Sequence, residues 1–374
     1  MGDIGAYKKA DRSLAAAYER VGRHAPGFDT IRLVAALMVV MHHVSIYDRD
    51  FDHLRDDPTF ILSHGYTTIG FFAVCLFFCI SGFLVTPGLV KTGDVTGYFS
   101  RRFMRIMPLL TVVVTGTVFV LGPLVTRLPL NDYFAAPDTW RYLKNITTSL
   151  SLRLPGAVNQ AGTEQVNGAL WTLRYEWLCY IVLGGLAFLH GLRRRGLVLA
   201  IWLGSVVVTA TFYADQTDPG GQPLMLAHLF AYFGAGVLLY LYREAVPATP
   251  LMGAAAAVLL LASWATGTAS LFAPGLTAYI VAILGLVRFP WSKVLAKGDI
   301  SYGVYLLHAP MIVLVLAFWT PPGPGLLLTA VLALTLPLAA LSWFMLEKPA
   351  LAHKTLPADL ARRVVGRISQ SQAA

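Results

Sequence analysis

The sequence predicts an all-α integral membrane protein, a polytopic bundle of about ten transmembrane helices with both termini in the cytoplasm. Of the 374 residues, 56% are hydrophobic and only 13% are charged, whereas soluble proteins average about 25% charged residues. Apolar runs long enough to cross a bilayer recur along the chain, and basic residues gather in alternate connections. We therefore attribute the net charge of +9 to membrane topology, with a lipid bilayer and no nucleic acid as partner.

Ten apolar runs of about 17–22 residues have the length of a transmembrane helix. They lie near residues 28–47, 66–87, 106–126, 169–190, 197–213, 224–242, 250–267, 272–288, 299–319 and 325–346. With the N-terminus placed inside, far more lysine and arginine residues fall on the cytoplasmic side than on the outer side, as the positive-inside rule requires.

Three regions follow from these runs. Residues 1–27 are polar and lack the apolar core of a signal peptide, so we expect a cytoplasmic extension there. Residues 28–349 form the predicted transmembrane domain, and residues 350–374 a cytoplasmic tail. The longest connection, residues 128–168, lies on the predicted outer side. Such long loops are uncommon and often functional, so this one either covers an outer site or is merely structural.

The first predicted helix carries three residues that are costly at bilayer depth, Arg32, His42 and His43. Intramembrane ionisable residues usually face the protein interior and mark a functional site. Arg32 and His43 lie within roughly 20° of the same helix face and about 16 Å apart along its axis. His43 suits general base catalysis, and Arg32 suits binding of an anionic or carbonyl oxygen. The structural alternative is a snorkelling arginine and a histidine bonded to a neighbouring helix.

Three arginines, Arg101, Arg102 and Arg105, lie in an inner loop that leads into a helix at Pro108. Arg102 and Arg105 are three positions apart and share a helix face. Several guanidinium groups beside a helix N-terminus make a phosphate-binding site. The alternative interpretation is ordinary charge that sets the topology.

A polar strip runs along the fourth predicted helix, where Thr172, Glu176 and Tyr180 fall at positions i, i+4 and i+8. A glutamate inside a membrane protein needs a partner, and Arg174 is one candidate. The strip therefore marks either a functional cavity or a structural ion pair.

A second polar strip is predicted on the ninth helix. Ser301, Tyr305 and His308 share one helix face, and their hydrogen-bonding groups either line a cavity or form a structural seam. His308 is a candidate neighbour of the base on the first helix.

The second predicted helix contains Cys75, Cys79 and the pair Ser81-Gly82. Free cysteines in an apolar run are usually small core residues, and their spacing indicates neither a disulfide nor a metal site. The Ser81-Gly82 pair permits close approach of another helix. No histidine adjacent in sequence marks Ser81 as a nucleophile.

These segments, in this order, resemble the acyltransferase-3 family, integral-membrane O-acyltransferases that use acyl-CoA. The matching residues are FDTIR…HH in the first helix, VCLFFCISGFL in the second, RRFMRIMP before the third, LWTLRYEW in the fourth, SYGVYLLH in the ninth and Glu347-Lys348-Pro349 at the end. The family's pattern of arginine, ten residues and histidine falls on Arg32 and His43, and its Arg-two-residues-Arg pattern falls on Arg102 and Arg105. One departure is Cys75, which stands where many members carry aspartate.

The resemblance implies transfer of an acyl group, with acetyl expected, from acyl-CoA to a hydroxyl of a carbohydrate, glycan, lipid or small natural product. His43 would act as base, on the acceptor hydroxyl or in forming a transient acyl-enzyme. The other implied catalytic residues are Arg32 and Glu176. The implied donor-binding residues are Arg101, Arg102, Arg105 and Ser81, and the implied site-lining residues are His42, Trp171, Tyr305 and His308. No metal is expected, and the expected location is the bacterial cytoplasmic membrane.

Two other functional classes compete with this interpretation. A transporter or flippase would use intramembrane Arg, His and Glu for coupling or substrate binding, but no inverted repeat is apparent in the sequence. A haem-binding membrane oxidoreductase would place histidines opposite each other on two helices.

Overall fold

Helices make up the regular secondary structure of the residues that the structure describes. The structure is a computed structural model that describes residues 12–22, 25–46, 56–157, 165–212, 221–321 and 323–363. Two isolated β-bridges, Ser13 with Pro247 and Arg153 with Gln165, complete the backbone pairing in these residues. The predicted all-α fold class is confirmed.

The longer helices follow the predicted apolar runs within a few residues, with one exception. The longer helices are α3 Gly27–Ile46, α5 Ile69–Thr92, α6 Val95–Gly116, α10 Trp171–Phe188, α11 Arg195–Phe212, α12 Gln222–Leu241, α13 Pro250–Ala265, α14 Ala269–Gly285, α16 Ser301–Phe318 and α17 Pro324–Ser342. The helix α6 begins at Val95 and not near residue 106, so the predicted inner loop with Arg101, Arg102 and Arg105 is wrong, and these arginines lie within α6 because the helix continues past the apolar run to its cap at Asp94. The short helices are α2 Leu14–Val21, α4 Pro58–Leu62, α7 Gly122–Val125, α8 Leu130–Ala135, α9 Pro137–Arg141, α15 Ser292–Leu295 and α18 Lys348–Ala352. Five 3₁₀ or π segments connect them, η1 Thr117–Leu121, η2 Tyr142–Thr147, η3 Gly168–Leu170, η4 Gly191–Arg193 and η5 Trp343–Glu347.

Seven helical stretches in the described residues are long and apolar enough to cross a membrane. They are α3, α5, Val95–Val125, α11, α12, α16 and Pro324–Arg363. The helices α13 and α14 are apolar but shorter, and α10 carries Arg174 and Glu176 among its 18 residues. The polytopic membrane character is therefore confirmed, while the number of ten spans and the cytoplasmic termini stay predictions.

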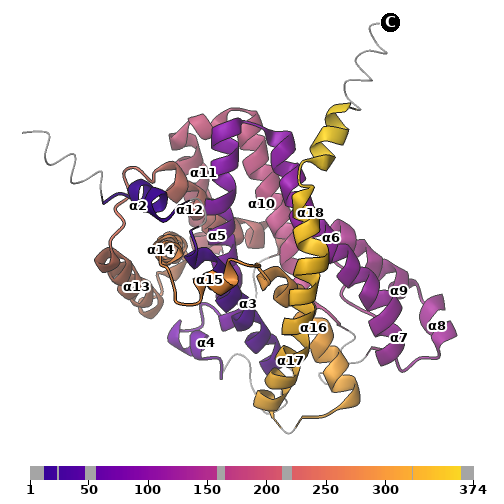
Figure 1. Ribbon diagram of the computed structural model, residues 1–374. Helices are drawn as coiled ribbons and strands as arrows, with labels where there is room; N and C mark the ends of the chain where they lie inside the picture. The colour runs from indigo at the N-terminus through magenta and orange to yellow at the C-terminus, as the bar shows by residue number, and fades with distance from the viewer. Residues whose placement is uncertain are drawn as a thin grey trace, which may run out of the picture.

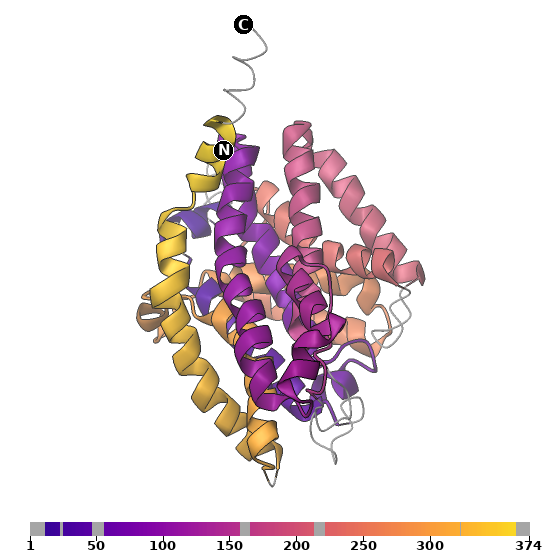
Figure 2. The same ribbon diagram turned by 90° about the vertical axis from the view of Figure 1, so that its right-hand side faces the viewer.

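Burial separates a central pair of helices from the peripheral ones. The helix α12 packs along α5 in the interior, and 83% of the most apolar window of α12 is buried. In contrast, α11 and the stretch that contains α17 are only 22% buried and lie toward the outside of the bundle (Figures 1 and 2). Large apolar side chains such as Phe212 and Met345 are exposed there, which is the surface a lipid-facing helix presents.

The two central helices approach closely because glycines face their partner's backbone. A Cβ atom on Gly82 would lie 2.0 Å from the carbonyl oxygen of Phe233, and one on Gly236 would lie 2.2 Å from that of Cys79. Small residues at such a crossing maximise van der Waals contact between helices that have no hydrophobic driving force in lipid. The close approach predicted for Ser81-Gly82 is therefore present, and the buried Cys75 and Cys79 lie in the same core.

The connection between α5 and α6 is a tight turn at the end predicted to face the cytoplasm. Gly93 has a φ of 64°, a left-handed conformation that ends α5 and suits glycine. Asp94 then caps α6 by accepting a hydrogen bond of 2.9 Å from the N–H of Gly97. The turn therefore holds Lys91 and the start of α6 close together.

A buried aspartate organises the opposite end of the bundle. Asp57 accepts hydrogen bonds from the N–H groups of Thr59 and Phe60, which caps α4, and from Ile69 at the start of α5. Burial alone would raise the pKa of Asp57, but the nearby His42 ring and these N–H groups outweigh it, so the pKa lies below its ordinary value. At neutral pH the Asp57 carboxylate is therefore ionised and connects α4 to the start of α5.

The long connection before α10, which the sequence predicts to lie on the outer side, contains several short helical segments. It contains α8, α9 and η2, and the hydroxyl of Tyr133 in α8 donates a 2.8 Å hydrogen bond to the carbonyl of Val118 in η1. Residues 158–164 of this connection, and residues 1–11 and 364–374 of the predicted terminal extensions, lie outside the described residues. The connection ends in η3, where Asn167 donates a hydrogen bond of 2.9 Å to the carbonyl of Leu306 in α16.

Candidate active site

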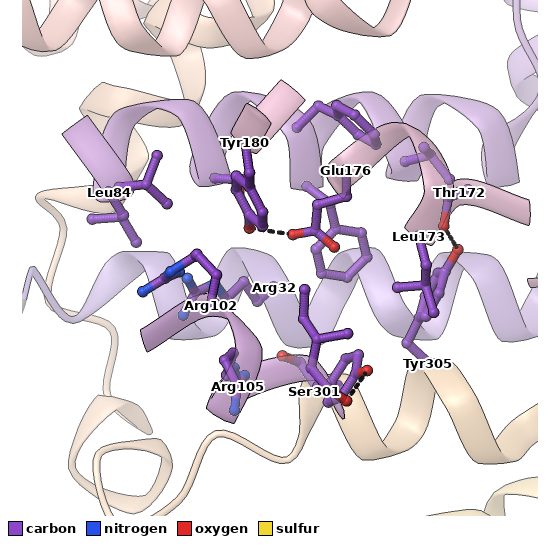
Figure 3. Close-up of a pocket in the computed structure, with 17 residues that line it drawn as sticks. Arg32, Leu84, Arg102, Arg105, Thr172, Leu173, Glu176, Tyr180, Ser301 and Tyr305 are labelled. Carbon is purple, nitrogen blue, oxygen red and sulfur yellow. Dashed lines mark hydrogen bonds between the residues drawn. The ribbon is translucent and has the colours of Figure 1, made fainter. Parts of the chain in front are cut away.

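A cavity of about 100 Å³, which we call the central cavity, lies between α3, α5, α6, α10 and α16. Six of the predicted site residues contribute to its lining, namely Arg32, Ser81, Arg102, Arg105, Glu176 and Tyr305. Figure 3 shows the three arginines at one end and the Thr172–Tyr305 pair at the other. The rest of the lining is largely apolar, with Phe77 and Phe78 among the larger side chains. The cavity therefore has a cationic end, formed by the arginines, and an uncharged polar end, formed by Thr172 and Tyr305.

The arginine end of the central cavity is an ion-pair network. Arg105 contacts two carboxylates, Asp299 through Nη2 at 2.6 Å and Glu347 through Nη1 at 3.2 Å. Arg32 contacts the same Asp299 oxygen at 3.2 Å and Asp29 at 3.7 Å. Since a buried charge is stable only when it is paired and hydrogen-bonded, these contacts hold α3, α6, α16 and η5 together.

Two of these carboxylates were not among the predicted site residues. Asp299 precedes the first turn of α16, where its side chain also accepts from the N–H and hydroxyl of Ser301. Glu347 ends the π-helical segment η5 and is only 2% exposed. The available sequence signal was the need of each intramembrane arginine for a carboxylate partner, but spacing along the chain does not identify which one.

The three neighbouring arginines have different surroundings. Arg102 lines the central cavity with its Cζ atom 5.9 Å from the centre of the Tyr180 ring, and its buried Nε has no hydrogen-bond partner. Among the described residues, no carboxylate lies within ion-pair distance of Arg102. Arg101 does not line the cavity and lies beside Gly88 and Gly97 near the α5–α6 turn. Of the three, Arg102 therefore has the greatest capacity for an added anion.

The polar strip of α10 forms a hydrogen-bonded chain along the cavity wall. The hydroxyl of Tyr180 donates a short hydrogen bond to Glu176 and shares one of 2.7 Å with Ser81 of α5. Because the Tyr180 hydroxyl has one proton and donates it to Glu176, Ser81 donates to Tyr180 in this arrangement. Among the described residues, Glu176 has no cationic partner, and the ion pair with Arg174 considered from the sequence is not present.

At the opposite end of the cavity, Tyr305 connects α16 to α10. Its hydroxyl donates to the carbonyl of Ala169 at 2.9 Å and shares a hydrogen bond of 2.6 Å with Thr172. The Tyr305 ring packs between Phe77 on the cavity side and His308, at centroid distances of 5.6 and 6.3 Å. Tyr305 therefore lines the central cavity and also contacts His308 of the histidine pair.

His43 and His308 form a hydrogen-bonded pair, with His43 Nδ1 3.1 Å from His308 Nε2. The Nδ1 atom of His308 lies 3.1 Å from the carbonyl oxygen of Val304, and that of His43 lies 3.0 Å from the carbonyl oxygen of Val39. Carbonyl oxygens only accept, so both Nδ1 atoms carry a proton. His308 Nε2 is then an acceptor for His43, and His43 Nε2 holds a free lone pair.

The free nitrogen of His43 faces a position without a side chain. A Cβ atom added to Gly168 would lie 3.5 Å from His43 Nε2, so the glycine keeps the space next to this nitrogen open. The neighbouring Asn167 fixes η3 by donating to Leu306 and accepting from the N–H of Ala169. The end of the long outer connection therefore lies against the nitrogen that is able to accept a proton.

Comparison with known proteins identifies the family. A family model described as an acyltransferase domain, that of the acyltransferase-3 family, matches residues 26–344. The protein belongs to the acyltransferase-3 family. It is therefore a membrane enzyme that transfers acyl groups.

Several curated proteins are similar to this acyltransferase over most of its length. It is 30% identical to nodulation protein 10 of Rhizobium leguminosarum bv. viciae over 369 residues, which cover 90% of this chain and 96% of that protein. It is 29% identical to an O-acetyl transferase of Shigella phage Sf6, with 86% and 94% covered. A peptidoglycan O-acetyltransferase of Listeria monocytogenes is 23% identical, with 87% of this chain and 56% of that protein covered. No solved structure matches the chain.

Five of the predicted site residues do not line the central cavity. Arg101 and the pair His43 and His308 are described above, and the other two are His42 and Trp171. His42 lies on the same helix as His43 but points to Asp57, with its Nδ1 3.8 Å from a carboxylate oxygen. Trp171 stacks on Phe71, with ring centroids 6.2 Å apart and planes inclined by 10°. Both residues therefore pack around the site, and neither lines the cavity.

Proposed function

We propose that the enzyme transfers an acetyl group from acetyl-CoA to a hydroxyl of a carbohydrate, glycan, lipid or small natural product, with His43 as general base. The observation that carries the proposal is the histidine pair, which leaves His43 Nε2 with a lone pair beside the open position at Gly168. An imidazole in this state accepts the proton of a hydroxyl as that oxygen attacks a carbonyl carbon.

The reaction follows from this geometry. The acceptor hydroxyl gives its proton to His43 Nε2 while its oxygen bonds to the thioester carbonyl carbon. The tetrahedral intermediate then breaks the carbon–sulfur bond, and the thiolate takes the proton from His43. The ester and free CoA leave, and His43 returns to its starting form. His308 Nε2 accepts from His43 Nδ1 throughout, which orients the ring and stabilises the transient imidazolium.

The donor enters from the arginine end in this proposal. Arg102 has no carboxylate partner among the described residues, so it is the cation best able to bind a CoA phosphate. Arg105 is held by two carboxylates and positions Asp299, which in turn positions Arg32. The distance of about 16 Å along α3 from Arg32 to His43 is then spanned by the pantetheine arm, with Ser81, Glu176 and Tyr305 lining its path.

The rival classes fit the histidines less well. The nitrogens of His43 and His308 are 3.1 Å apart and hydrogen-bonded, whereas two histidines that bind a haem iron from opposite faces would have their nitrogens about 4 Å apart with the iron between them. Family membership favours acyl transfer over transport. We also propose that residues 28–349 form one transmembrane catalytic domain. The proposed location of the enzyme is the bacterial cytoplasmic membrane.

The test uses purified protein, labelled acetyl-CoA and a panel of sugars, glycans, lipids and polyols. We expect label transfer to one acceptor class and a loss of about 10³-fold in kcat for His43→Ala, within the range of general base catalysis. His42→Ala is the matched control, since its ring points away from the cavity. Wild-type turnover by a folded His43→Ala variant would overturn the proposed role of His43 as base. If the wild-type enzyme does not use acetyl-CoA, the proposal that acetyl-CoA is the donor is wrong.

A further inference from the structure

A second cavity, of about 800 Å³, lies where α5 meets α6 and α10 meets α11, and we call it the basic hollow. The end of α12 completes its wall. These helix ends lie together at the top of the bundle in Figure 2, on the side that the sequence assigns to the cytoplasm. Its volume is within the range of small-molecule and cofactor sites, roughly 300–1,000 Å³.

The charged lining of the basic hollow is mostly cationic. Lys91, Arg193, Arg195 and Arg243 line it together with a single carboxylate, Asp94. The Asp94 carboxylate already caps α6 and accepts a 2.8 Å hydrogen bond from Arg362. The hollow therefore carries an excess of positive charge.

Two of these cations are available to a ligand. Arg243 and Arg195 share Glu244, at 3.4 and 3.8 Å. Lys91 and Arg193 have no carboxylate within ion-pair distance among the described residues, and each comes from a different wall of the hollow. Cations on two different walls, each with unused donors, suit a ligand that carries more than one phosphate.

The basic hollow and the central cavity share three helices. On α5, Val85 lines the cavity and Leu89 the hollow, about 6 Å further along the axis. On α10, the step from Tyr180 to Ala187 is about 10 Å. On α6, Arg102 and Thr96 are separated by about 9 Å. Along these helices the hollow therefore begins within about 10 Å of the residues that line the central cavity.

We propose that the basic hollow binds the phosphorylated adenosine end of the acyl-CoA donor. The inference rests on the proposed function, because it assumes that the donor arm occupies the central cavity. The pyrophosphate lies near Arg102, the arm extends toward His43, and the 3′-phosphate and adenine occupy the hollow between Lys91 and Arg193. An anionic lipid headgroup has the same phosphate chemistry and is the competing occupant.

The experiment compares Lys91→Ala and Arg193→Ala with Arg194→Ala. Arg194 is exposed in the same inner loop but does not line the hollow, so its loss removes the same topological charge. Adenosine 3′,5′-bisphosphate is the probe, measured as a competitive inhibitor against acetyl-CoA. We expect the inhibition constant and the KM for acetyl-CoA to rise about five- to tenfold in the first two variants and less than twofold in Arg194→Ala. Arg193→Lys should keep most of the affinity.

The outcomes separate the two proposals. Equal effects in all three variants, or unchanged inhibition by the bisphosphate, would show that these charges only set topology. If Lys91→Ala and Arg193→Ala lose co-purifying phosphatidylglycerol but keep wild-type inhibition by the bisphosphate, a lipid occupies the hollow and the inference is wrong. If the wild-type enzyme does not use acetyl-CoA, the proposed donor is wrong. This result differs from every outcome of the variant experiment, because it concerns the wild type alone.

Discussion

The two ends of the path from Arg102 to His43 are stabilised in different ways. At the arginine end, Arg32 and Arg105 are neutralised by Asp299 and Glu347, and Arg102 lines the cavity without a carboxylate partner among the described residues. At the outer end, the histidine pair is arranged by backbone carbonyls and by the imidazoles themselves. Substitutions in the ion-pair network should therefore affect folding first, and those at the histidine pair should affect turnover first.

The largest expected effect is that of Arg105→Gln. It leaves Asp299 and Glu347 without their main partner, and breaking a buried ion pair costs about 3–5 kcal/mol. We expect the melting temperature in detergent to fall by several degrees and the activity to be lost in parallel. Intrinsic tryptophan fluorescence measures the thermal unfolding. Arg101→Gln is the matched control and should melt like the wild type.

A triple variant sharpens the Arg105 prediction. Neutralising both carboxylates as well, in Arg105→Gln with Asp299→Asn and Glu347→Gln, should restore part of the melting temperature, because no buried charge is then left unpaired. If the triple variant melts below Arg105→Gln, Asp299 and Glu347 stabilise the fold by contacts other than those with Arg105.

His308→Leu tests the outer end. It removes the acceptor for His43 Nδ1 while Val39 still holds the proton in place, so we expect kcat to fall about tenfold, the effect of one lost hydrogen bond, with the melting temperature nearly unchanged. His308→Gln keeps an acceptor and should retain more activity. The pH dependence of kcat should change in His308→Leu and not in His308→Gln, whereas a purely structural role would leave both profiles alike.

Arg102→Gln should differ from Arg105→Gln, one helical turn away, in its effect on the melting temperature. Since Arg102 has no carboxylate partner to orphan, its loss should leave the melting temperature unchanged and raise the dissociation constant for acetyl-CoA about five- to tenfold. Isothermal titration in detergent measures this directly. A fall in stability equal to that of Arg105→Gln would place both arginines in the structural network and leave the donor without its proposed phosphate contact.

Much of this arrangement follows from local sequence patterns. Apolar length predicted the helices, and helical periodicity predicted that Thr172, Glu176 and Tyr180 share one wall, because both depend on residues a few positions apart. The partner of Arg105 could not be predicted in this way, since Glu347 lies 242 positions away in the sequence. Its contact with Arg105 depends on the position of the π-helical segment η5, which ends at Glu347. The orientation of Arg101 away from the cavity likewise depends on tertiary packing around the α5–α6 turn.

The smallest expected effect comes from Gly168→Ala, which tests how open the outer end must be. The added Cβ would lie 3.5 Å from His43 Nε2, an ordinary contact, so the fold should tolerate it while the acceptor hydroxyl loses room beside the base. We expect KM for the acceptor to rise about two- to fivefold with KM for acetyl-CoA unchanged, since small misplacements of a reacting group reduce rates. Gly168→Val should enlarge the effect on the same parameter. A change confined to the donor would mean that the acceptor reaches His43 from another side.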